Sequence, residues 1–311
     1  MTKKWTAEEI PDQGERTAIV TGANIGLGRI VARELARHGA KVILASRDSA
    51  KGTEAARAIT AAFPSSNVEA ARLDLADLTS IRAFADRIRA GNDQIDLLIN
   101  NAGVMAAPYK RTVDGFELQL GTNHLGHFAL TGLLLSLLHE RPDARVVTVS
   151  SQNHRGGQMR FDDLEGERRY SRWGGYAQSK LANLLFAFEL ERRLEAASWR
   201  LISVAAHPGY SATNLQLSGP PPLERLLMSL SNRLFAQPAE IGALPILYAA
   251  TAPDLKGGAY VGPDGPGEMR GHPVVVQASQ RASDPEDARR LWDISEQLTG
   301  VVFDFSSGRA A

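Results

Sequence analysis

Tyr176 and Lys180 lie four residues apart in the segment GGYAQSKLANLL, residues 174–185. On a helix, two side chains at this spacing share one face and lie one turn apart. A lysine beside a tyrosine can form an acid–base pair, because a neighbouring cation favours the phenolate. The same spacing also occurs between ordinary surface side chains, so the pair needs support from other parts of the sequence.

Apolar segments with strand character alternate along the chain with longer segments of helical period. The apolar segments lie at 17–21, 41–45, 68–73, 95–100, 144–150 and 200–206. The helical segments between them lie at 26–38, 50–62, 78–90, 114–139 and 176–197. This alternation predicts an α/β fold with a doubly wound, Rossmann-type parallel sheet that carries helices on both faces.

No linker divides the chain, so we expect a single domain at 15–311, preceded by an N-terminal extension at 1–14. The segment 210–240 is rich in Leu, Pro and small residues and is predicted to cover a substrate. Within it, 223–235 has the apolar stripe of a helix, which either packs on the domain or forms a flap. The Gly- and Pro-rich segment 262–273 predicts a C-terminal loop system.

The composition argues against several classes of protein. The formal net charge is zero and the pI is about 7.1, which does not indicate nucleic-acid binding. The chain contains no cysteine, which excludes disulfides, thiolate nucleophiles and Cys-ligated metals. The N-terminal segment lacks the apolar core of a signal peptide, and the apolar run at 128–138 is too short to span a bilayer. We therefore expect a soluble, cytoplasmic protein without a membrane anchor.

Three glycines, Gly22, Gly26 and Gly28, lie between the first predicted strand and the first predicted helix. Glycines at this position let the turn tighten and let the backbone approach a pyrophosphate, which the helix N-terminus attracts. The spacing Gly-x-x-x-Gly-x-Gly differs from the Gly-x-Gly-x-x-Gly fingerprint. A tight strand–helix turn without a ligand is therefore an alternative for this loop.

Ser46 and Arg47 follow the second predicted strand, where an acidic residue would accept from the ribose 2′-hydroxyl of NAD. A neutral residue removes repulsion, and a guanidinium can bind a 2′-phosphate through two hydrogen bonds. This pair favours NADP(H), with NAD(H) as the weaker candidate, unless Arg47 is a plain surface arginine.

Polar residues also follow the third and fourth predicted strands. Asp74 can accept a hydrogen bond from an adenine amino group or cap the helix that begins near Asp77, and the sequence leaves both open. The tetrapeptide NNAG at 100–103 allows close approach to a cofactor ribose, although such a turn also occurs without a ligand.

Six motifs occur in order along the chain: TGANIGLG, NNAG, TNHLGHF, VTVSSQNH, YAQSK and HPGYSAT. Together they closely resemble the short-chain dehydrogenase/reductase family over residues 15–300. The phrases NHLGHFALT, SKLANLLF and EIGALPILYAAT are similar to the branch that contains retinol dehydrogenases and WW-domain oxidoreductases. The resemblance implies a dinucleotide-binding oxidoreductase domain at 15–311 that uses NADP(H).

The resemblance also implies the site residues. The catalytic set is Asn123, Ser151, Tyr176 and Lys180. The cofactor-binding set is Gly22, Asn24, Ile25, Gly26, Leu27, Arg47, Asp74, Leu75, Asn101, Ala102, Gly103, Tyr176, Lys180, Pro208, Gly209, Ser211 and Thr213. We expect no metal, because His124, His127 and His154 do not have the spacing of a metal site. His207 is expected to stabilise its loop rather than to carry protons.

Two positions depart from the common family pattern. The 25 residues from Ser151 to Tyr176 exceed the usual spacing and fit the retinol-dehydrogenase-like branch, but Ser150 stays an alternative for the catalytic serine. Ser211 stands where the family often has a branched apolar residue, which leaves its nicotinamide contact open.

The implied chemistry is hydride transfer coupled to proton transfer. A free phenol has a pKa near 10, and a base working at neutral pH benefits from a value closer to 7. We expect Lys180 to lower the pKa of Tyr176 and to donate to the cofactor ribose. Ser151 is expected to orient the substrate oxygen, and Asn123 to bend its helix and hold a water molecule.

The sequence therefore predicts an NADP(H)-dependent oxidoreductase that transfers a hydride between nicotinamide and a lipophilic alcohol or carbonyl, with Tyr176 as general acid/base. The low charge of 210–240 and the apolar residues of the insertion at 152–173 favour a lipophilic substrate. The alternative is a non-catalytic NADP-binding regulatory protein on the same fold. The helices at 114–139 and 176–197 could pair two chains into a homodimer or homotetramer, and monomers also occur in this branch.

Overall fold

A computed structural model describes residues 4–92, 94–138, 141, 143–211 and 237–306. One eight-stranded sheet runs through the molecule in the order β3-β2-β1-β4-β5-β6-β7-β8. Its strands are β1 Thr17–Thr21, β2 Lys41–Ser46, β3 Asn67–Arg72, β4 Leu97–Asn100, β5 Arg145–Val149, β6 Ile202–Ala206, β7 Tyr260–Pro263 and β8 Pro273–Val275. All neighbouring strands are parallel except β7 and β8, which pair antiparallel. The predicted doubly wound α/β fold is confirmed.

The six predicted strands are all present, whereas β7 and β8 were missed. The prediction of a loop system at 262–273 is wrong at its two ends, where β7 finishes and β8 begins. These strands have four and three residues and include Pro263 and Pro273. Proline cannot donate to a sheet ladder, so its presence argues against a strand except at strand ends and sheet edges.

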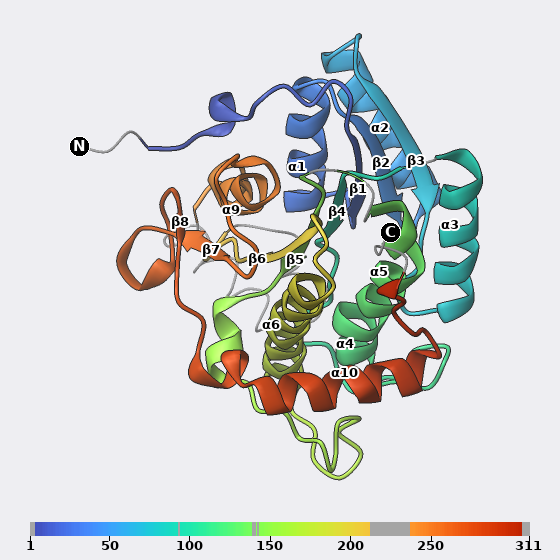
Figure 1. Cartoon of the computed structure of the whole chain (residues 1–311), viewed down its shortest axis with the longest axis vertical. Helices are drawn as coiled ribbons and strands as arrows, with labels where there is room; N and C mark the ends of the chain where they lie inside the picture. The colour runs from blue at the N-terminus through green and yellow to red at the C-terminus, as the bar shows by residue number, and fades with distance from the viewer. Residues whose placement is uncertain (1–3, 93, 139–140, 142, 212–236, 307–311) are drawn as a thin grey trace.

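Helices cover both faces of the sheet (Figure 1). They are α1 Gly26–Arg37, α2 Ser49–Ala62, α3 Leu78–Gly91, α4 Leu118–Leu120, α5 Gly126–Leu138, α6 Arg172–Ala196, α9 Ala239–Thr251 and α10 Pro285–Thr299. Short helical turns occur at Ala7–Glu9, Gln152–Gly156, Pro266–Glu268 and Gln280–Ser283. The predicted helix at 114–139 instead begins at Leu118 and contains a π-helical turn at Gly121–Leu125.

Strand β1 shows why the predicted strands are continuously apolar. Ala18 and Val20 belong to the core cluster that packs against α1, α2 and α9, whereas Ile19 belongs to the cluster on the other face with α3, α5 and α6. Because successive strand residues point to opposite faces, a strand covered on both sides needs apolar residues at every position.

The two neighbours of β1 in the sheet are β2 and β4, so the chain changes its winding direction between β1 and β4. The loops that follow these two strands therefore diverge at the carboxyl edge of the sheet. Ligands of open α/β sheets bind at such a switch point. The glycine loop after β1 and the turn after β4 both lie there.

The C-terminal helix α10 lies across α6 and α5 (Figure 1). Trp292 of α10 is buried, and its ring centroid lies 5.1 Å from that of Phe128 in α5 and 5.8 Å from that of Phe186 in α6. The resemblance suggests that two chains could pair through the helices that correspond to α5 and α6. The C-terminal helix α10 of the same chain covers part of both helices.

The N-terminal extension also packs on the domain where it is described. The Trp5 ring meets Tyr248 of α9 edge-on, with 5.3 Å between ring centroids, and Ile10 is buried in the core. Within the described ranges, none of the helices combines the length and apolar character needed to cross a membrane.

Candidate active site

Tyr176 and Lys180 lie on the buried face of α6, with side chains 4% and 3% exposed. Lys180 Nζ lies 5.9 Å from the centroid of the Tyr176 ring and donates a hydrogen bond to the Val149 carbonyl at 3.0 Å. The helix begins at Arg172, four residues before the predicted start, because the Ser171 side chain caps it by accepting from the Gly174 N–H. The pair is therefore held inside a regular helix against the end of β5.

The structure separates the two candidate serines. Ser150 is buried and its hydroxyl donates to the Lys180 carbonyl at 2.7 Å, so this hydroxyl fixes α6 against β5. Ser151 caps the following helical turn, and its side chain lowers the pKa of Tyr176, against the larger effect of burial. The geometry thus brings Ser151, and not Ser150, to the tyrosine.

The pKa of Tyr176 moves in the direction opposite to the prediction. Burial raises the pKa of Tyr176 to about 12, and the Ser151 side chain opposes this shift only in part. Burial also lowers the pKa of Lys180 to about 8. Both groups lie in a low-dielectric environment that disfavours their charged forms, and this effect exceeds the attraction between ammonium and phenolate. The protein's own groups therefore keep Tyr176 protonated at neutral pH.

Asn123 lies in the π-helical turn, which agrees with the expectation that it bends its helix. Its Nδ2 donates to the Val104 carbonyl and to Ser179 Oγ, both at 2.9 Å, and its Oδ1 accepts from the Val104 N–H at 2.7 Å. These bonds hold the turn after β4 against the helix. A Cβ built on Gly103 would lie 3.1 Å from Asn123 Oδ1 and 3.6 Å from Lys180 Nζ, so glycine allows this close approach.

His127 connects this helix to the glycine loop, a role that sequence reasoning missed. Its Nδ1 donates to the Asn123 carbonyl at 3.0 Å, and its Nε2 accepts from Thr21 Oγ1 at 2.9 Å. Burial lowers the pKa of His127 to about 4, so the ring is neutral and this tautomer is defined by its partners. Thr21 Oγ1 in turn accepts from the backbone N–H groups of Asn101 and Ala102, each at 2.9 Å.

No sequence signal identifies this connection, because His127 and Thr21 are 106 residues apart.

Among the residues that the structure describes, no cluster of His, Cys, Asp or Glu could hold a metal ion.

The loop between β1 and α1 forms a cradle that a side chain would fill. A Cβ on Gly28 would lie 2.6 Å from the Gly22 carbonyl oxygen and 2.5 Å from Asn101 Nδ2, so only glycine fits there. Gly26 has a φ of +57°, and no atom lies within 4 Å of the position its Cβ would take. Ile25 is 47% exposed beside this space. Open space at a helix N-terminus, lined by backbone N–H groups, fits the pyrophosphate of a dinucleotide.

The remaining cofactor-binding candidates lie at neighbouring strand ends. Arg47 follows β2 and is exposed. Asp77, and not Asp74, caps α3 by accepting from Thr79 and Ser80, so the capping role considered for Asp74 is excluded. Leu75 is buried against α5, where its carbonyl oxygen would lie 2.4 Å from a Cβ on Gly126.

Asn24 and Leu27 are half-buried in and after the glycine loop. Gly209, after β6, has a φ of +64° and would clash with the Met269 carbonyl if it carried a Cβ. Ser211 is buried and donates to the Pro208 carbonyl at 2.7 Å. Thr213, the segment 223–235 and most of 210–240 lie outside the described residues.

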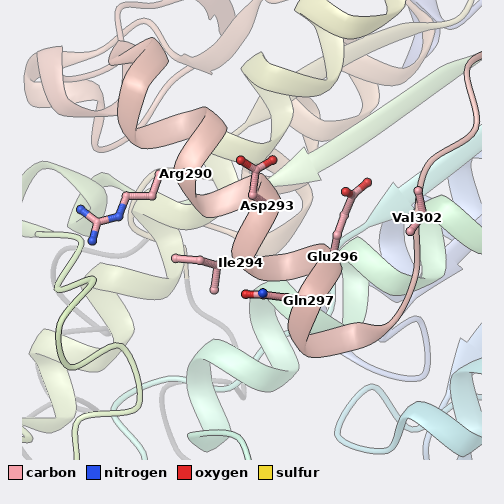
Figure 2. Close-up of a pocket in the computed structure, with 6 residues that line it drawn as sticks. All are labelled: Arg290, Asp293, Ile294, Glu296, Gln297 and Val302. Carbon is pink, nitrogen blue, oxygen red and sulfur yellow. The ribbon is translucent and has the colours of Figure 1, made fainter.

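A separate depression lies on the outer side of α10 (Figure 2). It is lined by Arg290, Asp293, Ile294, Glu296, Gln297 and Val302. None of these residues belongs to the predicted catalytic or cofactor-binding sets. Its charged residues all come from α10, where Glu296 accepts from the Trp292 and Phe303 N–H groups and Arg290 stacks on Phe161. The depression has no part in the site described above.

A doubly wound sheet, a glycine cradle at its switch point and a serine–tyrosine–lysine cluster at the adjoining strand end together define a dinucleotide-binding oxidoreductase. The family model described as short chain dehydrogenase matches residues 16–219. The chain belongs to this short-chain dehydrogenase family.

Its curated relatives include several retinol dehydrogenases. Retinol dehydrogenase 12 of Mus musculus is 42% identical over 292 residues, which cover 93% of this chain and 88% of that protein. Retinol dehydrogenase 13 of Homo sapiens is 42% identical over 294 residues, which cover 92% and 85% of the two chains.

Solved structures share the fold. A crystal structure of an uncharacterized protein from Mycobacterium paratuberculosis is 49% identical, with a TM-score of 0.82 over 97% of this chain and 100% of that one. The Pseudomonas aeruginosa RhlG/NADP active-site complex is 24% identical, with a TM-score of 0.60 over 80% and 94% of the two chains.

Proposed function

We propose that this protein is an NADP(H)-dependent oxidoreductase that transfers a hydride between nicotinamide and a lipophilic alcohol or carbonyl, with Tyr176 as the general acid/base. The observation that carries the proposal is the burial of Tyr176 together with Lys180, whose Nζ lies 5.9 Å from the centroid of the tyrosine ring one helical turn away. This cluster lies at the carboxyl edge of the sheet that also carries the glycine cradle, so a dinucleotide in the cradle can extend toward it.

The protein's own groups handle the proton. In the reductive direction, Ser151 donates a hydrogen bond to the carbonyl oxygen of the substrate and orients it. Tyr176, protonated at neutral pH, transfers its proton to that oxygen as negative charge develops there. Lys180 stabilises the phenolate that remains, because an adjacent cation favours it. The nicotinamide, when bound, supplies the hydride.

The raised pKa of Tyr176 favours carbonyl reduction over alcohol oxidation at neutral pH, because the tyrosine is present as the acid. Oxidation requires the phenolate, which is scarce when the pKa lies near 12. We therefore propose reduction as the faster direction in the neutral range.

The cofactor would be held by the backbone of the glycine cradle, the turn at 101–103 and Lys180. Arg47, exposed after β2, supports NADP(H) over NAD(H), because the strand end has no acidic residue to bind a 2′-hydroxyl or repel a 2′-phosphate. Asp74 is proposed to accept from the adenine amino group.

The insertion supports a lipophilic substrate through one residue in particular. Met159 and Phe161 are partly buried and pack against the core cluster that includes α6, and the Tyr170 hydroxyl donates to the Ala107 carbonyl at 2.8 Å. Trp173, in contrast, is 43% exposed, and its ring centroid lies 6.3 Å from that of Tyr176. It offers an apolar surface beside the Tyr176 ring, and the names of the relatives indicate a lipophilic alcohol, retinol, as their substrate.

The test is the replacement Tyr176→Phe. Turnover of NADPH with a panel of carbonyl compounds should fall by roughly 100-fold or more, since general acid catalysis contributes about 10²–10⁴. Fluorescence titration should show NADPH binding close to that of the unaltered protein. Full activity in the variant refutes the role of Tyr176. Tight NADPH binding by the unaltered protein with no oxidation across the panel favours the non-catalytic regulatory alternative.

A further inference from the structure

Three connections meet at the carboxyl edge of the sheet beside the catalytic cluster, because β5, β6 and β7 are neighbouring strands. The connection after β5 begins with Ser151. The connection after β6 contains Pro208 and Gly209, which the resemblance places next to the nicotinamide. The connection between β7 and β8 contains the short helical turn Pro266–Glu268.

One side chain, that of Glu268, bonds to both of the other connections. Its Oε2 accepts from Gln152 Nε2, on the residue directly after Ser151, and its Oε1 accepts from Arg155 Nη2 at 3.1 Å. The same Oε2 accepts from His207 Nε2 at 3.1 Å, on the other connection. A single carboxylate thus fixes the serine loop and the nicotinamide-side loop to each other.

His207 connects Glu268 to the backbone of Gly209. The ring is fully buried, and its Nδ1 accepts from the Gly209 N–H at 3.3 Å. Because Nδ1 is an acceptor, the proton lies on Nε2 and points to Glu268. Burial keeps the ring neutral by lowering the pKa of His207 to about 3. A Cβ on Gly262 would lie 2.1 Å from His207 Nε2, so only glycine at this position of β7 leaves room for the histidine ring.

The backbone at Glu268 is held in an unfavourable conformation. Glu268 has a φ of +55° and follows Gly267, whose φ is +62°. A residue with a Cβ rarely adopts this region, and one that does so persists only where surrounding contacts determine it. Backbone hydrogen bonds on both sides of Glu268 hold this conformation. The Gly265 N–H donates to the Arg270 carbonyl at 2.9 Å, and the Tyr210 N–H donates to the Met269 carbonyl at 2.7 Å. Such strain clusters at functional sites.

We propose that Glu268 is a positioning residue that fixes the Ser151 loop relative to the His207–Gly209 segment, and so sets where the substrate oxygen lies with respect to the nicotinamide. This inference rests on the proposed function. Glu268 acts through Gln152 and His207 and does not itself touch the reacting atoms.

The test compares Glu268→Ala with the control Glu167→Ala. Glu167 also pairs with an arginine, Arg111, and within the described residues it has no bond to Gln152, to the His207–Gly209 segment or to the turn Pro266–Glu268. Glu268→Ala should lower kcat for carbonyl reduction by about 10–100-fold, because small displacements of positioned groups have effects of this size. NADPH affinity should change by less than about threefold, since the cradle is untouched. Glu167→Ala should match the unaltered protein in both measurements.

A double-mutant cycle with Ser151→Ala separates positioning from a general structural role. If Glu268 acts through Ser151, Glu268→Ala should have much less effect on kcat when Ser151 is already alanine. An equal loss in both backgrounds overturns the proposal. If Glu268→Ala does not fold, Glu268→Gln keeps one oxygen acceptor for Gln152 and His207 and replaces the oxygen that faces Arg155 with an amide donor. A smaller loss of kcat is then expected from it, and no loss overturns the proposal.

Hydrogen exchange of peptides that cover 152–156 and 207–211 gives a readout independent of activity. Glu268→Ala should speed exchange in both peptides, and Glu167→Ala in neither. Unchanged exchange in both peptides overturns the proposal, whatever the activity. If the unaltered protein reduces no carbonyl on the panel, the proposed function fails, and the exchange result alone then decides whether Glu268 holds the two loops together.

Discussion

Replacing Ser150 or Ser151 with alanine removes the same single oxygen from adjacent positions, but the structure predicts different losses. The Ser150 hydroxyl is buried and donates to the Lys180 carbonyl at 2.7 Å. Deleting one such bond lowers the unfolding free energy by about 0.5–1.5 kcal/mol. For a domain of this size that corresponds to a fall in Tm of roughly 2–4 °C. Reduction activity should stay close to normal, because this hydroxyl faces the helix backbone.

The Ser151 hydroxyl accepts from the Asn153 N–H at 3.2 Å at the start of a single helical turn, so its loss should lower the unfolding free energy by about 1 kcal/mol or less. Its loss from the site is more serious. Removing one donor that stabilises a developing oxyanion lowers kcat by about 10²–10³, or roughly 2.7–4 kcal/mol of transition-state stabilisation.

Both variants can be compared by thermal unfolding and by the loss of NADPH absorbance with a reducible carbonyl. The expected pattern is a small stability loss with retained activity for Ser150→Ala, and a large activity loss with a small stability loss for Ser151→Ala. A hundredfold loss for Ser150→Ala, combined with near-normal activity for Ser151→Ala, would refute the geometric assignment of the catalytic serine.

Three further predictions concern charge. Arg47→Ser should weaken NADPH binding by about 10–100-fold, because that is what a hydrogen bond to a charged group contributes. Fluorescence titrations should show unchanged NADH binding. Parallel losses for both cofactors would contradict the contact between Arg47 and the 2′-phosphate. In carbonyl reduction, kcat/KM should be flat from about pH 6 to 7 and fall as pH rises through about 8, where Lys180 loses its proton, since burial lowers the pKa of Lys180 to about 8 while that of Tyr176 stays near 12. A profile that is flat to pH 10 speaks against a charged Lys180 in turnover. Burial raises the pKa of Glu191 to about 7, so the folded protein binds more protons than the unfolded chain between about pH 4.5 and 7, and stability falls as pH rises through that range. Glu191→Gln should therefore raise Tm by roughly 2–4 °C at pH 8 and have little effect on Tm at pH 4. An equal change in Tm at both pH values would show that the buried charge of Glu191 is not what lowers stability.

Much of the fold could be predicted because its signals are local. Five of the six predicted strands, β1, β2, β4, β5 and β6, are almost fully buried, which requires the continuous apolar runs visible in the sequence. The sixth, β3, lies at the edge of the sheet and is only partly buried. The glycines before α1 and the spacing of Tyr176 and Lys180 are local as well. The resemblance then assigned roles to Asn123 and Ser151, which the structure brings together with that pair.

The sequence by itself thus determined the class of fold and the family and predicted the residues of the site, because each of these depends on short patterns along the chain. Only the tertiary structure decided how those residues behave. It decided that Ser151 rather than Ser150 meets Tyr176, and that burial raises the pKa of Tyr176 instead of Lys180 lowering it. It also revealed Glu268, which bonds to Gln152 across 116 residues of sequence. The physical reason is that burial and hydrogen bonding between distant segments depend on packing in three dimensions, which leaves no periodic trace in the chain.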